Sequence, residues 1–177
     1  MANLNQHGVI SVSADVSEAL AFFDGLNVNK QAIRKNLMRV TGSGAVNAAR
    51  RGVSNTLHNR TNKLKRGIRF VYGFKYDYVK LYSNADSGKP TSKDGRNARY
   101  GFMLAHGYTI RDQNEETLTF MIGGRWIRKH QITVPPKDWL EPSVLRYSQS
   151  AELDQRLDKE FQRQVNYWEK KITGSNL

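Results

Sequence analysis

Basic residues crowded into one stretch are the clearest chemistry in the sequence. Between Gly25 and Tyr76 there are twelve Lys or Arg residues and no Asp or Glu. The rest of the chain carries sixteen basic and sixteen acidic side chains, so the net charge of +12 comes from this stretch. Such a field holds a polyanion at short range, since salt screens it over roughly 10 Å. The stretch predicts either a nucleic-acid-binding surface or a solvated helix face.

Eight of these basic residues are candidates for contact with DNA or with an acidic partner protein: Arg34, Lys35, Arg50, Arg51, Arg60, Lys63, Lys65 and Arg66. The aromatic residues that alternate from Phe70 to Tyr78 resemble a base-stacking platform, but an alternating strand more often points its aromatic side chains into the core. Trp126 lies among basic residues and has the same two interpretations. For it we favour an edge strand whose charges block unwanted pairing.

No pattern of catalytic or metal-binding residues is present in the sequence. The four histidines are far apart, the acidic residues are scattered, and cysteine is absent. The segment Gly42-Ser43-Gly44 is a fragment of a phosphate-binding loop, but it has no preceding strand and predicts a helix kink instead. We therefore expect no enzyme, no catalytic residue, no metal site and no cofactor. A nuclease that assembles distant carboxylates by folding remains the alternative.

The elements that must position the basic residues follow from periodicity. A short helix is expected over 14–26, and a longer one over 29–57, capped by Asn29 and kinked at the glycines. Period-two alternation predicts a strand over 68–78 with a turn near Gly73. The polar segment 83–99 predicts a long loop or arm, and 117–134 a hairpin with a glycine turn, stopped by Pro135. An amphipathic helix over 141–172 should lie across the sheet.

This order predicts an α+β fold in which a mostly antiparallel sheet carries a long N-terminal helix and a C-terminal amphipathic helix on one face. At 177 residues the chain has about the length of one domain. We expect an N-terminal segment over 1–28 and a single domain over 29–177. No apolar run approaches the roughly 20 residues of a membrane span. The start of the chain lacks the pattern of a signal peptide, so we expect a soluble protein made in the cytoplasm.

Three short motifs, taken in their order along the chain, support a resemblance to a known family. Arg60-Thr61-Asn62-Lys63-Leu64 lies between the basic helix and the first strand. Tyr100-Gly-Phe-Met-Leu-Ala-His106-Gly107-Tyr108 follows the polar segment, and Pro136-Lys-Asp-Trp139-Leu140-Glu-Pro142 leads into the last helix. Together they resemble the tail-completion, or head-tail connector (neck), proteins of tailed bacteriophages. Seven residues carry the match: Thr61, Leu64, Tyr100, Gly107, Trp139, Leu140 and Pro142. The chain departs from the pattern at Asn62, where the family has glycine, and it lacks an acidic residue of the second motif.

The resemblance implies a structural virion protein at the head-tail junction, acting in the neck or as a tail terminator. Members of this family assemble into a homo-oligomeric ring that joins head to tail and lets double-stranded DNA pass. Its neighbours would be the head-connector and tail-tube proteins, with no membrane involved and assembly in the host cytoplasm. The alternative from the residues alone is a nonspecific nucleic-acid-binding protein that uses the basic helix 29–57, which lacks a helix-turn-helix pattern.

Overall fold

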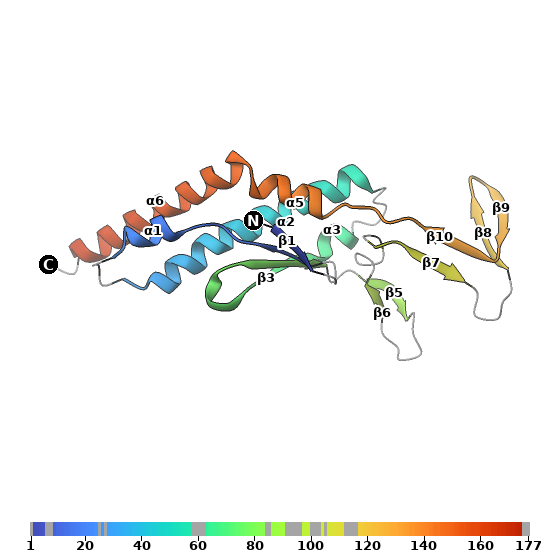
Figure 1. Ribbon diagram of the computed structural model, residues 1–177, viewed down its shortest axis with the longest axis horizontal. Helices are drawn as coiled ribbons and strands as arrows, with labels where there is room; N and C mark the ends of the chain where they lie inside the picture. Colours follow the sequence, from blue (N-terminus) through green and yellow to red (C-terminus); the bar gives the residue numbers. More distant parts are fainter. Residues whose placement is uncertain are drawn as a thin grey trace.

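The computed structural model describes residues 2–5, 9–24, 26, 28–57, 63–83, 86–90, 97–99, 104, 106–111 and 117–174. The fold is α+β, as the sequence predicts, with helices on one face of an antiparallel sheet (Figure 1). The main sheet has the order β1 (Ala2–Asn5), β2 (Val9–Val12), β4 (Val79–Ser83) and β3 (Ile68–Tyr72). Its helices are α1 (Ser17–Ala21), α2 (Lys30–Thr56), α3 (Lys63–Gly67), α5 (Glu141–Ser148) and α6 (Ala151–Gly174).

The long helix α2 is the centre of the molecule and packs against the sheet, α5 and α6. It begins as predicted, because the Asn29 side chain accepts a hydrogen bond of 3.1 Å from the backbone N–H of Ala32. The predicted kink at Gly42 and Gly44 is wrong, since the helix continues through both glycines. Both are buried beneath aromatic rings: the ring of Phe70 covers Gly42 and that of Tyr147 covers Gly44. Close packing on glycine therefore outweighs its low helix propensity.

The strand expected over 68–78 is shorter than predicted. β3 ends at Tyr72, and the chain turns through a 3₁₀ segment, η1 (Phe74–Tyr76), before returning as β4. The suggested turn near Gly73 is confirmed, with a hydrogen bond of 2.8 Å from the Gly73 N–H to the Tyr78 carbonyl. Phe70 and Tyr72 pack against the main core. For these two residues the core interpretation of the alternation is confirmed, whereas Phe74 in the turn is 74% exposed.

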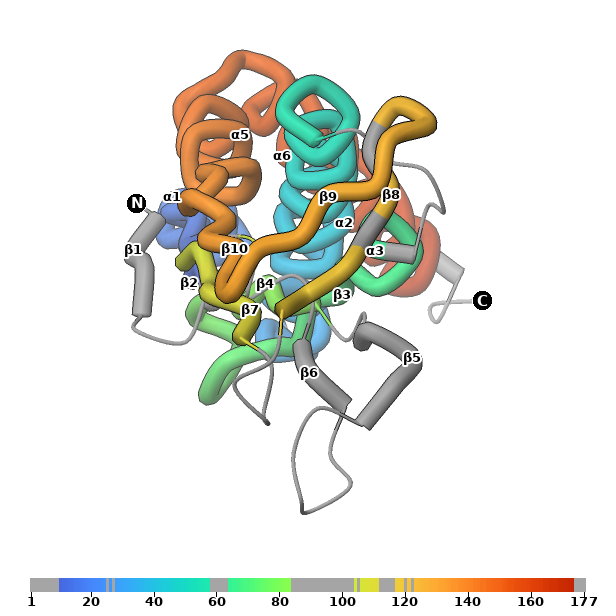
Figure 2. Tube along the Cα trace, turned by 90° about the vertical axis from the view of Figure 1, so that its right-hand side faces the viewer, coloured from blue at the N-terminus to red at the C-terminus, as the bar shows by residue number. Residues whose placement is uncertain are grey.

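An arm of two-stranded sheets projects from the body (Figure 1) and faces the viewer in Figure 2. In it β7 (Tyr108–Arg111) pairs with β10 (Gln131–Val134), and β8 (Leu118–Ile122) pairs with β9 (Arg125–Lys129). The glycine turn of the predicted hairpin is confirmed, because Gly123 and Gly124 have φ of 57° and 81°. The strand predicted to run on to Val134 is instead divided at His130, since its two halves pair with different strands.

The segment 83–99, expected to be a long loop or arm, contains two paired strands. Within it β5 (Asp86–Pro90) pairs with β6 (Asn97–Arg99) as antiparallel strands. Residues 84–85 and 91–96 lie outside the described part of the chain. These strands are held by backbone pairing, so no alternation of apolar side chains marks them in the sequence.

The helix predicted over 141–172 is two helices. α5 ends at Ser148, and Ser150 bonds back to the Tyr147 carbonyl through its N–H (3.1 Å) and its hydroxyl (2.7 Å). α6 packs against α2 rather than across the sheet. Its apolar face meets a second core made by Phe23, Ile33 and Leu37. The sheet face is already covered by α2 and α5, which leaves α6 to the outer side of the helical layer.

Candidate nucleic-acid interface

Four basic side chains from three consecutive elements line one groove of about 430 Å³. α2 contributes Arg50, α3 contributes Lys65 and Arg66, and β3 contributes Arg69. The short helix α3 makes this possible, because it turns the chain from the end of α2 back into the sheet beside Arg50. We call these four residues the basic groove.

Hydrogen bonds to backbone carbonyls fix the two arginines of the basic groove. Arg50 donates from Nε to the Lys65 carbonyl at 3.1 Å and from a terminal nitrogen to the Ile68 carbonyl at 3.4 Å. Arg69 donates to the Ile68 carbonyl at 3.1 Å and to the Arg66 carbonyl. These bonds tie α3 to β3, so both arginines also have a structural role. A guanidinium has five N–H donors, which leaves both side chains further donors for a phosphate.

The electrostatics of the basic groove favour an anionic ligand. Among the residues that the structure describes, no carboxylate lines it. Arg66 and Arg69 are exposed, and Arg50 and Lys65 are half-buried. Arginine forks and lysine ammonium groups at such spacing suit the phosphates of a nucleic-acid backbone, which are read without regard to base sequence.

Other basic residues predicted to face a ligand lie elsewhere and have other contacts. Arg34 forms a 2.6 Å ion pair with Asp77. Lys35 lies over the ring of Tyr76, 5.5 Å from its centroid. Arg51 points to α6, where it pairs with Glu152 at 3.1 Å. The basic stretch of the sequence is thus divided over several faces of α2.

Two of the predicted basic residues cannot be placed in this groove. Arg60 lies outside the described residues, and for Lys63 the structure describes the backbone alone. Arg69 was absent from the predicted contact residues, although the sequence holds a signal for it. It alternates with buried Ile68 and half-buried Phe70 on β3, which puts its side chain on the outer face.

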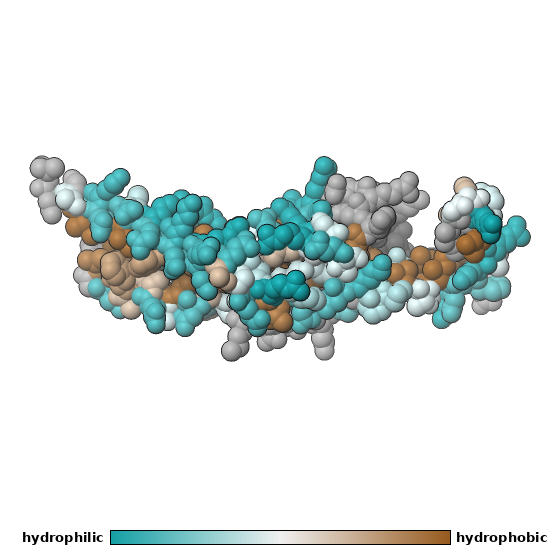
Figure 3. Space-filling view, turned by 90° about the horizontal axis from the view of Figure 1, so that it is seen from above, coloured by the Kyte–Doolittle hydropathy of each residue, from teal (hydrophilic) through white to brown (hydrophobic). Residues whose placement is uncertain are grey.

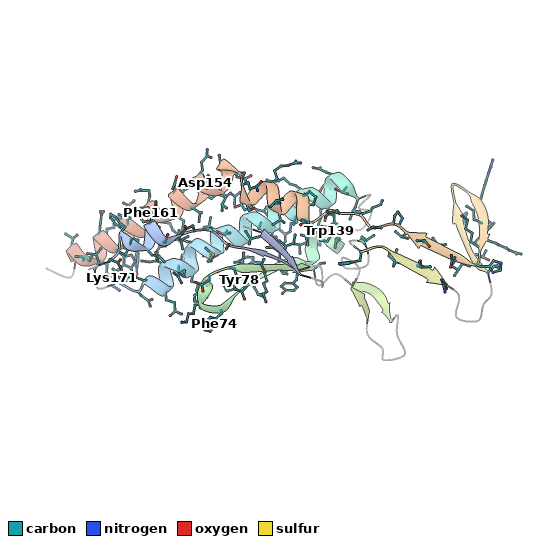
Figure 4. The ribbon with its side chains drawn as sticks, viewed as in Figure 1. Phe74, Tyr78, Trp139, Asp154, Phe161 and Lys171 are labelled. Carbon is teal, nitrogen blue, oxygen red and sulfur yellow. The ribbon has the colours of Figure 1, made fainter. Side chains whose placement is uncertain are left out.

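Those residues of the three motifs that the structure describes lie near the junction between the body and the arm. Leu64, Trp139 and Leu140 are buried in the main core, and Trp139 lies just before the start of α5, on the side of the arm (Figure 4). Gly107 has φ of 72°, and a Cβ there would lie 2.8 Å from the Val134 carbonyl oxygen. Pro142 occupies the first turn of α5, as predicted. Thr61 and Tyr100 lie outside the described residues.

The described residues contain no group of three or more His, Cys, Asp or Glu side chains that could hold a metal ion. Within the same residues, no helix is both long and apolar enough to cross a membrane. Burial raises the pKa of the Tyr147 hydroxyl, with smaller contributions from Arg156, Glu152 and Arg51. That hydroxyl has no hydrogen-bond partner among the described residues and lies against Gly44. Tyr147 is therefore a core residue that packs against α2.

Comparisons of the chain with protein-family models, with curated proteins and with solved structures found no match. The fold and the basic groove describe an α+β protein with a projecting arm and a cluster of four basic side chains near the C-terminal end of its long helix.

Proposed function

We propose that this chain is a structural subunit of a ring at the head-tail junction of a tailed bacteriophage, in the neck or at the end of the tail. The ring would join head to tail and let double-stranded DNA pass. It has no catalytic role, and its neighbours are head-connector and tail-tube proteins.

Three segments on which the resemblance rests come together in space, and this observation carries the proposal. Leu64, Leu104 and Trp139 belong to one core cluster although the sequence separates them widely. The Lys137 N–H donates a 2.9 Å hydrogen bond to the Leu104 carbonyl, which ties the second motif to the third. The three motifs of the resemblance therefore contribute to one packed junction of the fold.

The basic groove fits the passage of DNA through such a ring. Each copy offers a few phosphate contacts, and a ring repeats them around its axis. Weak, sequence-independent contacts of this kind let DNA slide, whereas tight ones would hold it. The same groove would also fit an acidic face on a neighbouring virion protein.

Negative-stain imaging of the purified protein, alone and with candidate connector and tail-tube proteins, tests the proposal. Rings, or rings capping tail tubes, are the expected result. A chain that stays monomeric under all these conditions, yet binds duplex DNA with a steep salt dependence, would contradict it.

That contrary result describes the second candidate, a free nonspecific nucleic-acid-binding protein. The observation in its favour is the basic groove itself, in which no described carboxylate competes for the four cations. The helix 29–57 is a weaker candidate for the contact surface than the sequence suggests, because Arg34 and Arg51 already pair with Asp77 and Glu152.

A further inference from the structure

A groove between α1 and α6 combines an apolar floor with an acidic rim. Its volume is about 510 Å³. On the floor, the ring of Phe22 packs edge-to-face on that of Phe161, with centroids 5.5 Å apart, yet Phe22 stays 55% exposed. Figure 3 shows hydrophobic surface at this end of the body, edged by hydrophilic residues, and Figure 4 places Phe161 and Asp154 along α6. We call this site the α1–α6 groove.

The rim of the α1–α6 groove is strongly anionic. Four carboxylates line it: Asp15, Glu18, Asp154 and Asp158. Within the described residues none of the four forms an ion pair. Hydrogen bonds from the hydroxyl and the N–H of Ser17 hold the pKa of Asp15 below its ordinary value. The groove therefore fits an occupant that is apolar at its centre and basic around it.

The β8–β9 hairpin of the arm has the complementary surface. Trp126 and Met121 lie directly opposite each other in its register, and they are 70% and 58% exposed. In an antiparallel ladder such partners share one face, and Arg128, two residues from Trp126, is on that face too. Arg125 and Lys129 add two more positive charges, and the sequence from 117 to 134 contains no Asp or Glu.

The apolar side chains Trp126 and Met121 of the hairpin are exposed, not packed against the described rest of the chain. It projects from the rest of the molecule (Figure 1). A two-stranded hairpin is at best marginally stable alone in water. An exposed Trp and Met next to each other, flanked by arginines, have the composition of an interface centre.

We propose that the β8–β9 hairpin of one copy of this chain binds the α1–α6 groove of a second copy. Trp126 and Met121 fill the groove beside Phe22, and Arg128 faces the acidic rim. The basic groove is a poorer receptor, because it would repel the hairpin and all four described residues of its lining are basic.

The two surfaces lie toward opposite ends of the long axis (Figure 1), so the contact is head-to-tail. Each copy donates a hairpin and receives one, which generates a closed ring or an open filament. This inference deepens the proposed ring assembly and rests on it.

Two charge-changing variants test the contact through the mass of the assembly, measured by light scattering and native mass spectrometry. The hairpin variant is Trp126→Ala with Arg128→Glu, and the groove variant is Asp154→Lys with Asp158→Lys. Each variant alone is expected to lose the oligomer and run as a monomer. An equimolar mixture should form dimers and nothing larger, since it contains one intact hairpin and one intact groove per pair. Glu169→Lys with Asp138→Lys, equal in charge change and off the groove, should assemble like the wild type.

Because the chain has no cysteine, a site-specific cross-link gives a second measurement that detects the contact directly. Met121→Cys with Glu18→Cys, treated with a short bis-maleimide, should give a ladder of covalent oligomers that dilution does not abolish. Rings that persist in both charge variants, with no such ladder, would overturn this contact while leaving the proposed function standing. A wild-type chain that stays monomeric alone and with connector and tail-tube proteins would overturn both.

Discussion

Gly44 lies inside a helix, where glycine has a low propensity, but its surroundings leave no space for a side chain. A Cβ there would lie 1.8 Å from the hydroxyl oxygen of Tyr147 and 2.3 Å from its Cζ. We expect Gly44→Ala to lower the free energy of unfolding by about 1–2 kcal/mol. The gain in helix propensity of about 1 kcal/mol is smaller than an overpacking cost of about 3 kcal/mol. Urea denaturation measures the difference.

The neighbouring Ser43 provides the control for this substitution. It is exposed on the same helix, and its hydroxyl donates a 3.0 Å hydrogen bond to the Val40 carbonyl. Ser43→Ala should change stability by less than about 0.5 kcal/mol. Equal denaturation midpoints for the two variants would mean that the ring of Tyr147 does not lie on Gly44.

Tyr147 itself gives a prediction about pH. Burial raises the pKa of its hydroxyl, so the folded protein holds this proton to higher pH than the unfolded chain. Above about pH 10 the unfolded chain binds fewer protons, and stability must therefore fall as pH rises further. Tyr147→Phe should remove this part of the alkaline loss. At neutral pH it should be neutral or stabilising, because the buried hydroxyl lacks a partner among the described residues. Urea denaturation at pH 8 and pH 10.5 measures this loss for the wild type and for Tyr147→Phe. Equal losses of unfolding free energy in the two proteins would mean that the hydroxyl is accessible to water.

At the scale of elements, local side-chain patterns predict where helices and turns form, but they do not predict how distant elements pack on one another. The start of α2 at Asn29 and the glycine turn of the hairpin depend on local chemistry, and both are confirmed. The kink at Gly42 was wrong, because a distant ring on β3 covers that glycine. The break between α5 and α6 does have a local signal in the sequence, a serine before the acidic first turn of α6. The prediction of one continuous helix followed the spacing of apolar residues and missed this signal. Likewise, the basic stretch was visible, but which of its residues share a groove depends on how α3 turns.

The contact between α6 and α2 gives a prediction at this scale. Leu37 is buried in the second core, whereas Trp168 is half-buried against the same cluster. Leu37→Ala should cost about 2–5 kcal/mol. Trp168→Ala should cost about 2 kcal/mol, less than the roughly 3–5 kcal/mol of a fully buried aromatic side chain. Thermal denaturation compares both with Asn166→Ala, an exposed change on the same helix. A Trp168→Ala variant that melts like Asn166→Ala would mean that this end of α6 is held by something other than α2.

At the scale of the whole molecule, the net charge of +12 is the sum of basic and acidic surfaces that lie in different places. The basic groove lies at the base of α2, the acidic α1–α6 groove beside the N-terminal helix, and the basic hairpin at the tip of the arm. Opposite charges at the two ends favour association between copies, while the basic groove stays available to DNA or to another protein. A single count of charges along the sequence cannot separate these two uses.

Duplex DNA binding at several salt concentrations separates them. Lys65→Glu with Arg66→Glu removes two cations of the basic groove whose side chains make none of the arginine bonds that tie α3 to β3. If phosphates bind there, the slope of log K against log salt should become shallower by about 2, because each lost phosphate contact removes about 0.9 from it. Lys159→Glu with Lys170→Glu changes the total charge equally on exposed positions of α6. This control should lower affinity modestly and leave the slope near that of the wild type. Identical slopes for both double variants would assign DNA binding to the overall charge and leave the basic groove to a protein neighbour.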